Sequence, residues 1–137
     1  MDIRRADHVA LLVKEVDRSR QFYSQVLGMQ EIPRPPNFDF PGAWLTRGDF
    51  QIHLIGEEVA GRALETHPGY LPEELALGRV THLAFEVANL EVARQHLQAL
   101  GVPIVGGPRP RGDGVMQLYI CDPDGHVIEL FTWTSPS

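Results

Sequence analysis

Two stretches of the chain follow the same order of apolar and polar residues. The first, DHVALLVKEVDRSRQFYSQVLGM, spans residues 7–29, and the second, THLAFEVANLEVARQHLQALGV, spans residues 81–102. Each opens with a polar residue, a histidine and a short apolar run, which is typical of a strand. Each then crosses a polar turn into a helical pattern that ends at a glycine, Gly28 or Gly101. The pattern therefore predicts a duplicated strand–helix unit.

Both predicted helices have a start signal and an apolar face. Asp17 and Asn89 stand where a side-chain oxygen can accept hydrogen bonds from the free N–H groups of a first helical turn. Apolar side chains, joined by His96 in the second helix, then recur at helical spacing, which predicts the packed face of each helix. These side chains are Phe22, Val26 and Leu27 in the first helix, and Val92, His96, Leu97 and Leu100 in the second.

Short β-type runs follow each helix. In the first half we predict strands at residues 30–32, 43–47 and 50–55, and in the second half at residues 103–105, 116–121 and 127–132. The sequences GD at residues 48–49 and DPDG at residues 122–125 are turns that join the last two strands of each half. Each half is thus predicted to be β-α-β-β-β, and the fold class to be α+β with two βαβββ modules.

We expect the two modules to form one domain over residues 1–137. Module one covers residues 3–56, and module two covers residues 80–134. The linker at residues 57–79 contains several glycines and prolines, and we predict one helical turn in it, at residues 73–77. A chain of this length can bury most of the surface that its unfolded form exposes.

Four potential metal ligands occupy equivalent positions in the two halves. His8 and His82 each open the first strand of a module, and His53 and Glu129 each lie in the last strand. Because strand side chains alternate between faces, His8 and His82 point away from the apolar face that suits packing on the helices. Donors at matching positions in both halves therefore predict one interior site.

The mixture of imidazole and carboxylate suits a divalent first-row metal, namely Zn, Ni, Mn or Fe(II). Two histidines and one carboxylate leave coordination positions open for water or substrate. Glu129 lies between apolar stretches, and a buried carboxylate is costly unless a cation or hydrogen bonds satisfy it. Any one histidine alone would be interpreted as a strand-end residue with a local hydrogen bond. The four residues together favour a metal site.

Composition narrows the range of functions. Hydrophobic residues make up 43% of the chain and charged residues 22%, which is typical of a globular protein. The formal net charge is −6 and no Lys/Arg-rich run occurs, which argues against nucleic acid or an anionic membrane as a partner. The single cysteine, Cys121, excludes an intramolecular disulfide, and the apolar run at residues 9–13 is too short for a signal peptide. We therefore expect a soluble cytoplasmic protein with a small-molecule substrate.

These motifs make the chain similar to the vicinal-oxygen-chelate superfamily. The superfamily includes glyoxalase I, bleomycin-binding proteins, extradiol dioxygenases, fosfomycin-resistance thiol transferases and methylmalonyl-CoA epimerase. The most specific segments are DHVALLV, FYSQVLGM, FQIHLI, THLAFEV and LYICDPDGHVIELF, and the resemblance covers nearly the whole chain. It implies two βαβββ modules whose curved mixed sheets form a cup around one divalent metal ion, in a protein that forms a homodimer.

For the site, the resemblance to glyoxalase I implies metal ligands at His8, His53, His82 and Glu129. Glyoxalase I usually has Glu at the second of these positions, so His53 is a departure that leaves the metal and the chemistry open. A substrate would chelate the metal through adjacent oxygens, which stabilises an enolate or a similar oxyanion. Glu129 would then be the catalytic base of a lyase or isomerase: it would leave the metal and abstract the carbon-bound proton of a hemithioacetal.

Three other functions stay open. Extradiol dioxygenases use a His, His, Glu triad, which His8, His82 and Glu129 match, but they carry a catalytic His in the stretch that here is GDGVMQ. In a thiol transferase, Arg109 and Arg111 would bind an anion, although a solvated loop is the simpler interpretation. Superfamily members that sequester drugs without catalysis lack the metal ligands, so the retained donors argue against that class.

Aromatic residues and prolines complete the prediction. Residues 33–41 contain four prolines and are predicted to be a stiff loop over the mouth of the cup. Four aromatic residues either line that mouth or pack in the core. They are Phe38, Phe40, Trp44 and Trp133.

Overall fold

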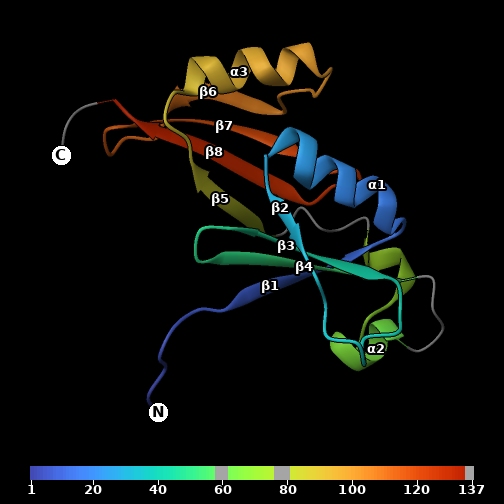
Figure 1. The fold of residues 1–137 in the computed structure, drawn as a ribbon. Helices are drawn as coiled ribbons and strands as arrows, with labels where there is room; N and C mark the ends of the chain where they lie inside the picture. Colours follow the sequence, from blue (N-terminus) through green and yellow to red (C-terminus); the bar gives the residue numbers. More distant parts are fainter. Residues whose placement is uncertain (58–61, 76–80, 135–137) are drawn as a thin grey trace. The chain divides into compact units, whose positions relative to one another are not determined.

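The computed structural model of the chain describes residues 1–57, 62–75 and 81–134 (Figure 1). The chain divides into two compact units, Met1–Leu75 and Ala76–Ser137. Each unit contains an open four-stranded sheet and helices of its own, so the predicted α+β class is confirmed. In the described part of the chain, no helix is long and apolar enough to cross a membrane.

The elements of the first unit are β1 (His8–Val13), α1 (Val16–Gln21), the π-helix η1 (Phe22–Val26), β2 (Gln30–Ile32), β3 (Gly42–Arg47), β4 (Phe50–Gly56) and α2 (Arg62–Thr66). The strand order is β1-β4-β3-β2, with β1 parallel to β4 and the other neighbours antiparallel. Residues 33–41 form the predicted loop. The helical turn predicted at residues 73–77 is present at residues 72–75, and its last two positions lie outside the described residues.

The elements of the second unit are β5 (His82–Glu86), α3 (Leu90–Ala99), β6 (Gly106–Pro110), β7 (Val115–Cys121) and β8 (Val127–Trp133). The strand order is β5-β8-β7-β6, and again only the first pair, β5 and β8, is parallel. This is the order found in the first unit. The predicted duplication of a βαβββ module is therefore confirmed as a duplication of topology.

Helix α1 begins earlier than predicted. Its N-cap is Glu15 rather than Asp17, which lies in the first turn with its carboxylate 2.6 Å from Arg20. The buried residues of α1 and η1 are Val16, Ser19 and Tyr23. Val16 is buried on the same helical face as Ser19 and Tyr23. The helix therefore begins one residue before Asp17. The packed face is therefore shifted by about one residue from the predicted face, whose side chains are only partly buried.

Helix α3 has the predicted N-cap but a different packed face. Asn89 Oδ1 accepts a hydrogen bond from the Val92 backbone N–H at 3.0 Å. Leu90 and Leu97 are the buried residues, whereas Val92 is 60% exposed and Leu100 is 47% exposed. Leu90 and Leu97 are two helical turns apart and so share a face, which Val92 cannot join because it lies about 200° further round the helix. The prediction of Val92, His96 and Leu100 on the packed face was wrong, because all three are exposed.

The second strand of the second module was placed wrongly at residues 103–105. The strand is β6, at Gly106–Pro110, and it lies at the edge of the sheet. An edge strand tolerates proline because one side of it needs no ladder hydrogen bond. At Gly107, where φ is +74°, a Cβ atom would lie 2.6 Å from the Gln117 carbonyl oxygen. Gly107 thus allows this edge strand to approach β7 closely.

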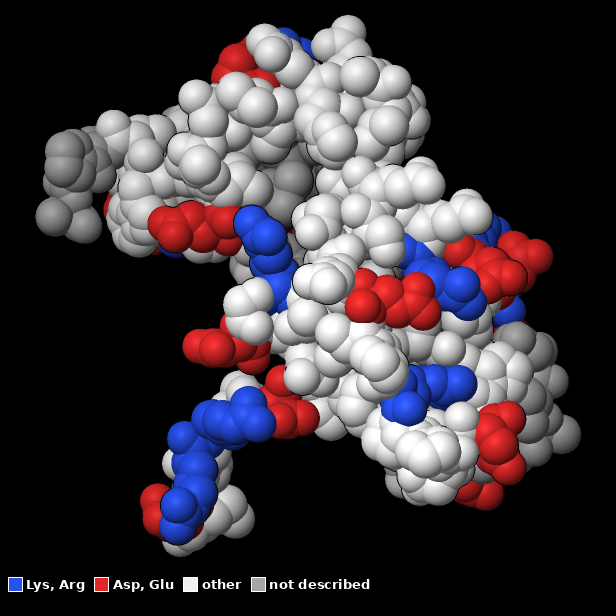
Figure 2. Space-filling view, viewed as in Figure 1, with Lys and Arg blue, Asp and Glu red and all other residues white. Residues whose placement is uncertain are grey.

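Charged side chains of both signs lie next to each other on the molecular face in Figure 2. The ion pairs Arg20–Asp17 and Arg94–Glu91, each at 2.6 Å, belong to this kind of local pairing along a helix. Such exposed pairs contribute little to stability. The ion pair between Arg111 and Glu129 differs from these pairs, because the Glu129 side chain is buried.

Candidate functional site

Three rings stack on one face of the first sheet. The register pairs His53 in β4 with Trp44 in β3 and with Ala10 in β1, and His8 lies two residues before Ala10 on the same face. The His53 ring centre is 3.9 Å from that of Trp44, with the planes 5° apart, and 3.8 Å from that of His8, with the planes 13° apart. Phe38 meets Trp44 edge-on at 5.4 Å. Of the four aromatic residues singled out from the sequence, Trp44 therefore borders His53 and Phe38 packs against Trp44.

Burial lowers the pKa of the His53 imidazole. His53 is 8% exposed, and burial lowers the pKa of its imidazole from 6.5 to about 4. The neighbouring His8 lowers the pKa of His53 further, while the Asp7 carboxylate opposes the shift. The His53 Nε2 atom is 2.8 Å from the amide oxygen of Gln51, its neighbour along β4. His53 is thus a neutral, hydrogen-bonded ring at neutral pH.

His8 opens β1 with its side chain 38% exposed. Its Nδ1 atom lies 2.7 Å from the Asp7 carboxylate, and the hydrogen bond from His8 lowers the pKa of Asp7. A carboxylate accepts but does not donate, so Nδ1 of His8 carries the proton. When the ring is uncharged, its lone pair is therefore on Nε2, as in metal-ligating histidines with a carboxylate partner.

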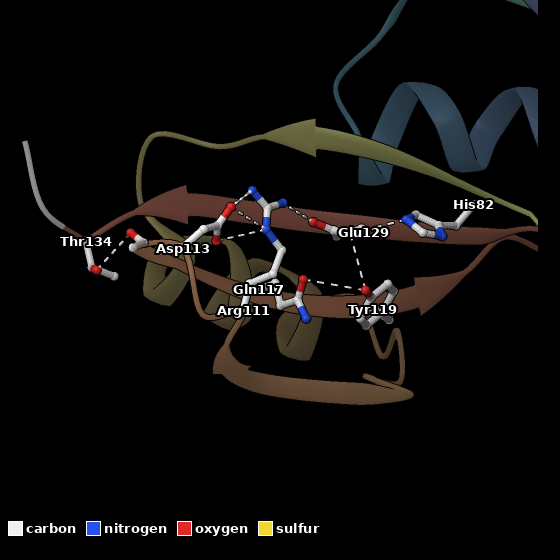
Figure 3. Close-up of polar contacts among 8 residues, drawn as sticks. His82, Arg111, Asp113, Gln117, Tyr119, Glu129 and Thr134 are labelled. Atoms are coloured by element: carbon white, nitrogen blue, oxygen red, sulfur yellow. Dashed lines mark hydrogen bonds and ion pairs between the residues drawn. The ribbon is translucent and has the colours of Figure 1, made fainter. Parts of the chain in front are cut away.

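The second unit carries a polar network around Glu129 (Figure 3). Glu129 lies in β8 and is 3% exposed. Its Oε2 atom accepts a hydrogen bond from Arg111 Nη1 at 2.9 Å, and its Oε1 atom accepts one from the Tyr119 hydroxyl at 3.2 Å. His82 Nε2, at the start of β5, is 3.3 Å from Oε1. The buried carboxylate is satisfied by its own chain, with a cation on one oxygen and two polar groups on the other.

Arg111 is the residue that sequence reasoning assigned wrongly. Its guanidinium binds Asp113 through Nε and Nη2 and reaches Glu129 with Nη1, so it is not part of a merely solvated loop. The hydrogen bond to Asp113 is the largest cause of a raised Arg111 pKa, and the same bond lowers the pKa of Asp113. The signal was available in principle, because a buried Glu129 requires a cationic partner from a neighbouring strand or turn.

Tyr119 was missed as a site residue. In β7 it pairs with Glu129 in the register, as Trp44 pairs with His53 in the first unit. Burial raises the pKa of the Tyr119 hydroxyl, and the Glu129 carboxylate raises it further. The Arg109 guanidinium lies over the Tyr119 ring, 5.6 Å from its centre. The position that carries the His53 ring in the first unit thus carries the hydrogen-bonded Glu129 carboxylate in the second, and each is paired with an aromatic residue.

A family model described as the glyoxalase/bleomycin resistance protein/dioxygenase superfamily matches residues 5–130. The chain belongs to this superfamily. A protein named Glyoxylase I 4 from Arabidopsis thaliana is 33% identical over 126 residues, which are 90% of this chain and 68% of that protein. A lactoylglutathione lyase of Neisseria meningitidis is 31% identical over 90% of this chain and 85% of its own length.

The fold of the superfamily is equally clear in solved structures. An integron cassette protein from the mobile metagenome of V. cholerae has a TM-score of 0.74 and 29% identity. The match covers 96% of this chain and 97% of that one. The resemblance stated from the motifs and the two-module architecture are therefore confirmed.

Members of the glyoxalase superfamily commonly use divalent metals, and the donors of the second unit fit one. His82 Nε2 and Glu129 Oε1 are 3.3 Å apart. An imidazole nitrogen and a carboxylate oxygen this close together could both bind one divalent ion. Among the residues that the structure describes, no three His, Cys, Asp or Glu side chains gather closely enough to hold a metal ion. The four-residue centre of His8, His53, His82 and Glu129 stays a prediction.

Proposed function

We propose that the chain is a divalent-metal-dependent enzyme of the glyoxalase type, a lyase or isomerase for a small substrate that chelates through adjacent oxygens. The observation that carries the proposal is the His82–Glu129 pair, with donor atoms 3.3 Å apart on the polar face of the second sheet. The relatives named above support the same reaction class.

Three residues would hold the metal, which would be Zn, Ni, Mn or Fe(II). They are His8 through Nε2, His82 through Nε2 and Glu129 through Oε1. When bound, the ion polarises the substrate oxygens and stabilises the negative charge that develops on them. Three protein ligands leave room for those oxygens.

Glu129 is the proposed catalytic base. Its carboxylate accepts the proton from the carbon beside a substrate carbonyl and returns it to the neighbouring carbon, so the proton balance closes without an oxidant or reductant. Arg111 and Tyr119 bind one oxygen each and fix the plane of the carboxylate. This positioning matters because proton transfer needs hydrogen-bond reach between base and substrate.

Metal analysis of the purified protein tests the proposal. We expect near-stoichiometric divalent metal in the wild type and in Glu91→Gln, a control on the exposed face of α3, where Glu91 pairs with Arg94. Glu129→Gln should lose the metal and lower turnover of a methylglyoxal–thiol adduct by a factor of about 100 or more. Turnover of catechols or fosfomycin instead would redirect the assignment to a dioxygenase or a thiol transferase.

A second candidate is a module that sequesters a small molecule without catalysis. One observation favours it: Arg111 already satisfies the buried charge of Glu129 at 2.9 Å, so the carboxylate does not need a metal ion to be stable. This candidate predicts a wild-type protein that is metal-free after purification and stays so in the presence of added Zn²⁺, Ni²⁺ or Mn²⁺. Ligand-induced thermal shifts without turnover would then support it.

A further inference from the structure

His53 occupies the position of a metal ligand, yet its ring is enclosed by two other rings. Trp44 covers one face at 3.9 Å and His8 covers the other at 3.8 Å. His53 is 8% exposed, whereas the side chain of His8 is 38% exposed. The outer histidine is accessible and the inner one is packed between rings.

The ring geometry prevents His8 and His53 from sharing one metal ion. The lone pair of an imidazole nitrogen lies in the ring plane, so a shared ion must lie in both planes. With a metal–nitrogen distance of about 2.1 Å, the ion would be about 3.2 Å from each ring centre, and planes 3.8 Å apart at their centres would have to open to roughly 70°. The planes are only 13° apart, so each ring can direct its lone pair only past the other.

Hydrogen bonds assign different tasks to the two rings. Asp7 accepts from Nδ1 of His8, which leaves Nε2 of His8 as the donor atom for a metal. Gln51 accepts from Nε2 of His53 at 2.8 Å through its amide oxygen, so that nitrogen carries a proton and has no lone pair to offer. The remaining nitrogen of His53 lies in a ring plane almost parallel to that of His8.

We infer that His53 is a positioning residue and not a ligand: its ring, backed by Trp44, fixes the plane of the His8 imidazole by stacking. The inference rests on the proposed metal site and explains why His53 is not among its protein donors, which are His8, His82 and Glu129. It also accounts for the departure from the glutamate of glyoxalase I, because stacking requires a ring and not a negative charge.

Two substitutions separate stacking from ligation. His53→Phe keeps a flat ring between Trp44 and His8 but removes both nitrogen atoms, whereas His53→Ala removes the ring. Titration calorimetry with Zn²⁺ should give an affinity for His53→Phe within about threefold of the wild type. His53→Ala should bind about tenfold or more weakly, as expected when the orienting partner of a ligand is lost.

Cobalt(II) gives a spectroscopic readout that does not depend on activity. The visible absorption of the Co²⁺ form reports the number and type of ligands, so His53→Phe should keep the wild-type spectrum. A changed spectrum together with weak Zn²⁺ binding by His53→Phe would show that a His53 nitrogen is a ligand and would overturn the inference. Wild-type affinity in His53→Ala would overturn it as well, because no ring would then be needed.

Metal binding by the wild type distinguishes failure of the proposed function from failure of the assignment of His53. If the wild-type chain binds neither Zn²⁺ nor Co²⁺, the proposed function fails and the inference fails with it. If the wild type binds both ions and His53→Phe loses them, the proposed function stands and the assignment of His53 is wrong. Should His53→Ala fail to fold, His53→Phe alone decides the matter, because retained binding supports stacking and lost binding supports ligation.

Discussion

Acid should destabilise the metal-free protein through His53 in particular. Burial holds the pKa of the folded imidazole at about 4, against 6.5 for an ordinary histidine. Between these two values the unfolded chain binds the proton and the folded chain does not, so protonation favours unfolding. The contribution of His53 to stability is therefore complete above about pH 6.5 and is lost as the pH falls toward 4.

The size of this effect follows from the two pKa values. Proton linkage between pKa 6.5 and about 4 gives a loss of about 2 kcal/mol in the free energy of unfolding when the pH is lowered from about 7.5 to about 5. Other titrating groups add their own pH dependence, so the contribution of His53 is measured as a difference between variants. His53→Phe keeps the buried ring and removes the titrating group.

Urea denaturation of the metal-free protein, followed by circular dichroism at the two pH values, measures the difference. The wild type should lose about 2 kcal/mol more than His53→Phe over this interval. Trp44→Phe is a matched control, because it retains a ring against His53 and keeps the histidine, so it should follow the wild type. Equal pH dependence in the wild type and His53→Phe would refute the claim that His53 is held neutral by burial.

Three further predictions concern separate features. Asn89→Ala removes the side chain that caps α3 and should lower the free energy of unfolding by about 1 kcal/mol in urea denaturation. Gly107→Ala places a Cβ atom 2.6 Å from the Gln117 carbonyl oxygen at a φ of +74°, so the Tm should fall by several degrees, and an unchanged Tm would contradict this contact. Arg111→Gln leaves the buried Glu129 without its cation and should lower the urea midpoint of the metal-free protein, whereas the double variant Arg111→Gln/Glu129→Gln should recover most of the loss. A double variant no more stable than Arg111→Gln alone would show that the two side chains do not depend on each other.

Sequence patterns predicted the fold well where local signals and packing agree. The apolar runs of β3, β4, β7 and β8 and the turns between them were found from their composition, because the residues in them favour the structures they adopt. β6 was misplaced because glycine and proline argue locally against a strand, and only its place at the sheet edge permits them. The N-terminus of α1 was misplaced because burial of Val16 outweighs the capping preference of Asp17.

Within each unit, strand parity predicted which side chains lie close together but not how they are oriented. His8 lies close to His53, and His82 lies close to Glu129. The alternation of side chains along a strand does not specify ring orientation. The stacking of His53 on Trp44 and His8 could therefore not be predicted. Nor does a strand pattern reveal that the Arg111 side chain reaches across to Glu129, since the two residues lie on different elements.

The equivalent strand pairings of the two units have a consequence for how the sequence of such a chain can diverge. His53 and Glu129 hold the same place in two hydrogen-bonded ladders, as do Trp44 and Tyr119. A substitution at one of these places alters the chemistry of one half without disturbing the backbone of either. After duplication of an ancestral module, one copy could keep a buried carboxylate while the other carried a stacked imidazole at the same place. New ligand preferences would then arise from a few side chains of β3 and β4 alone.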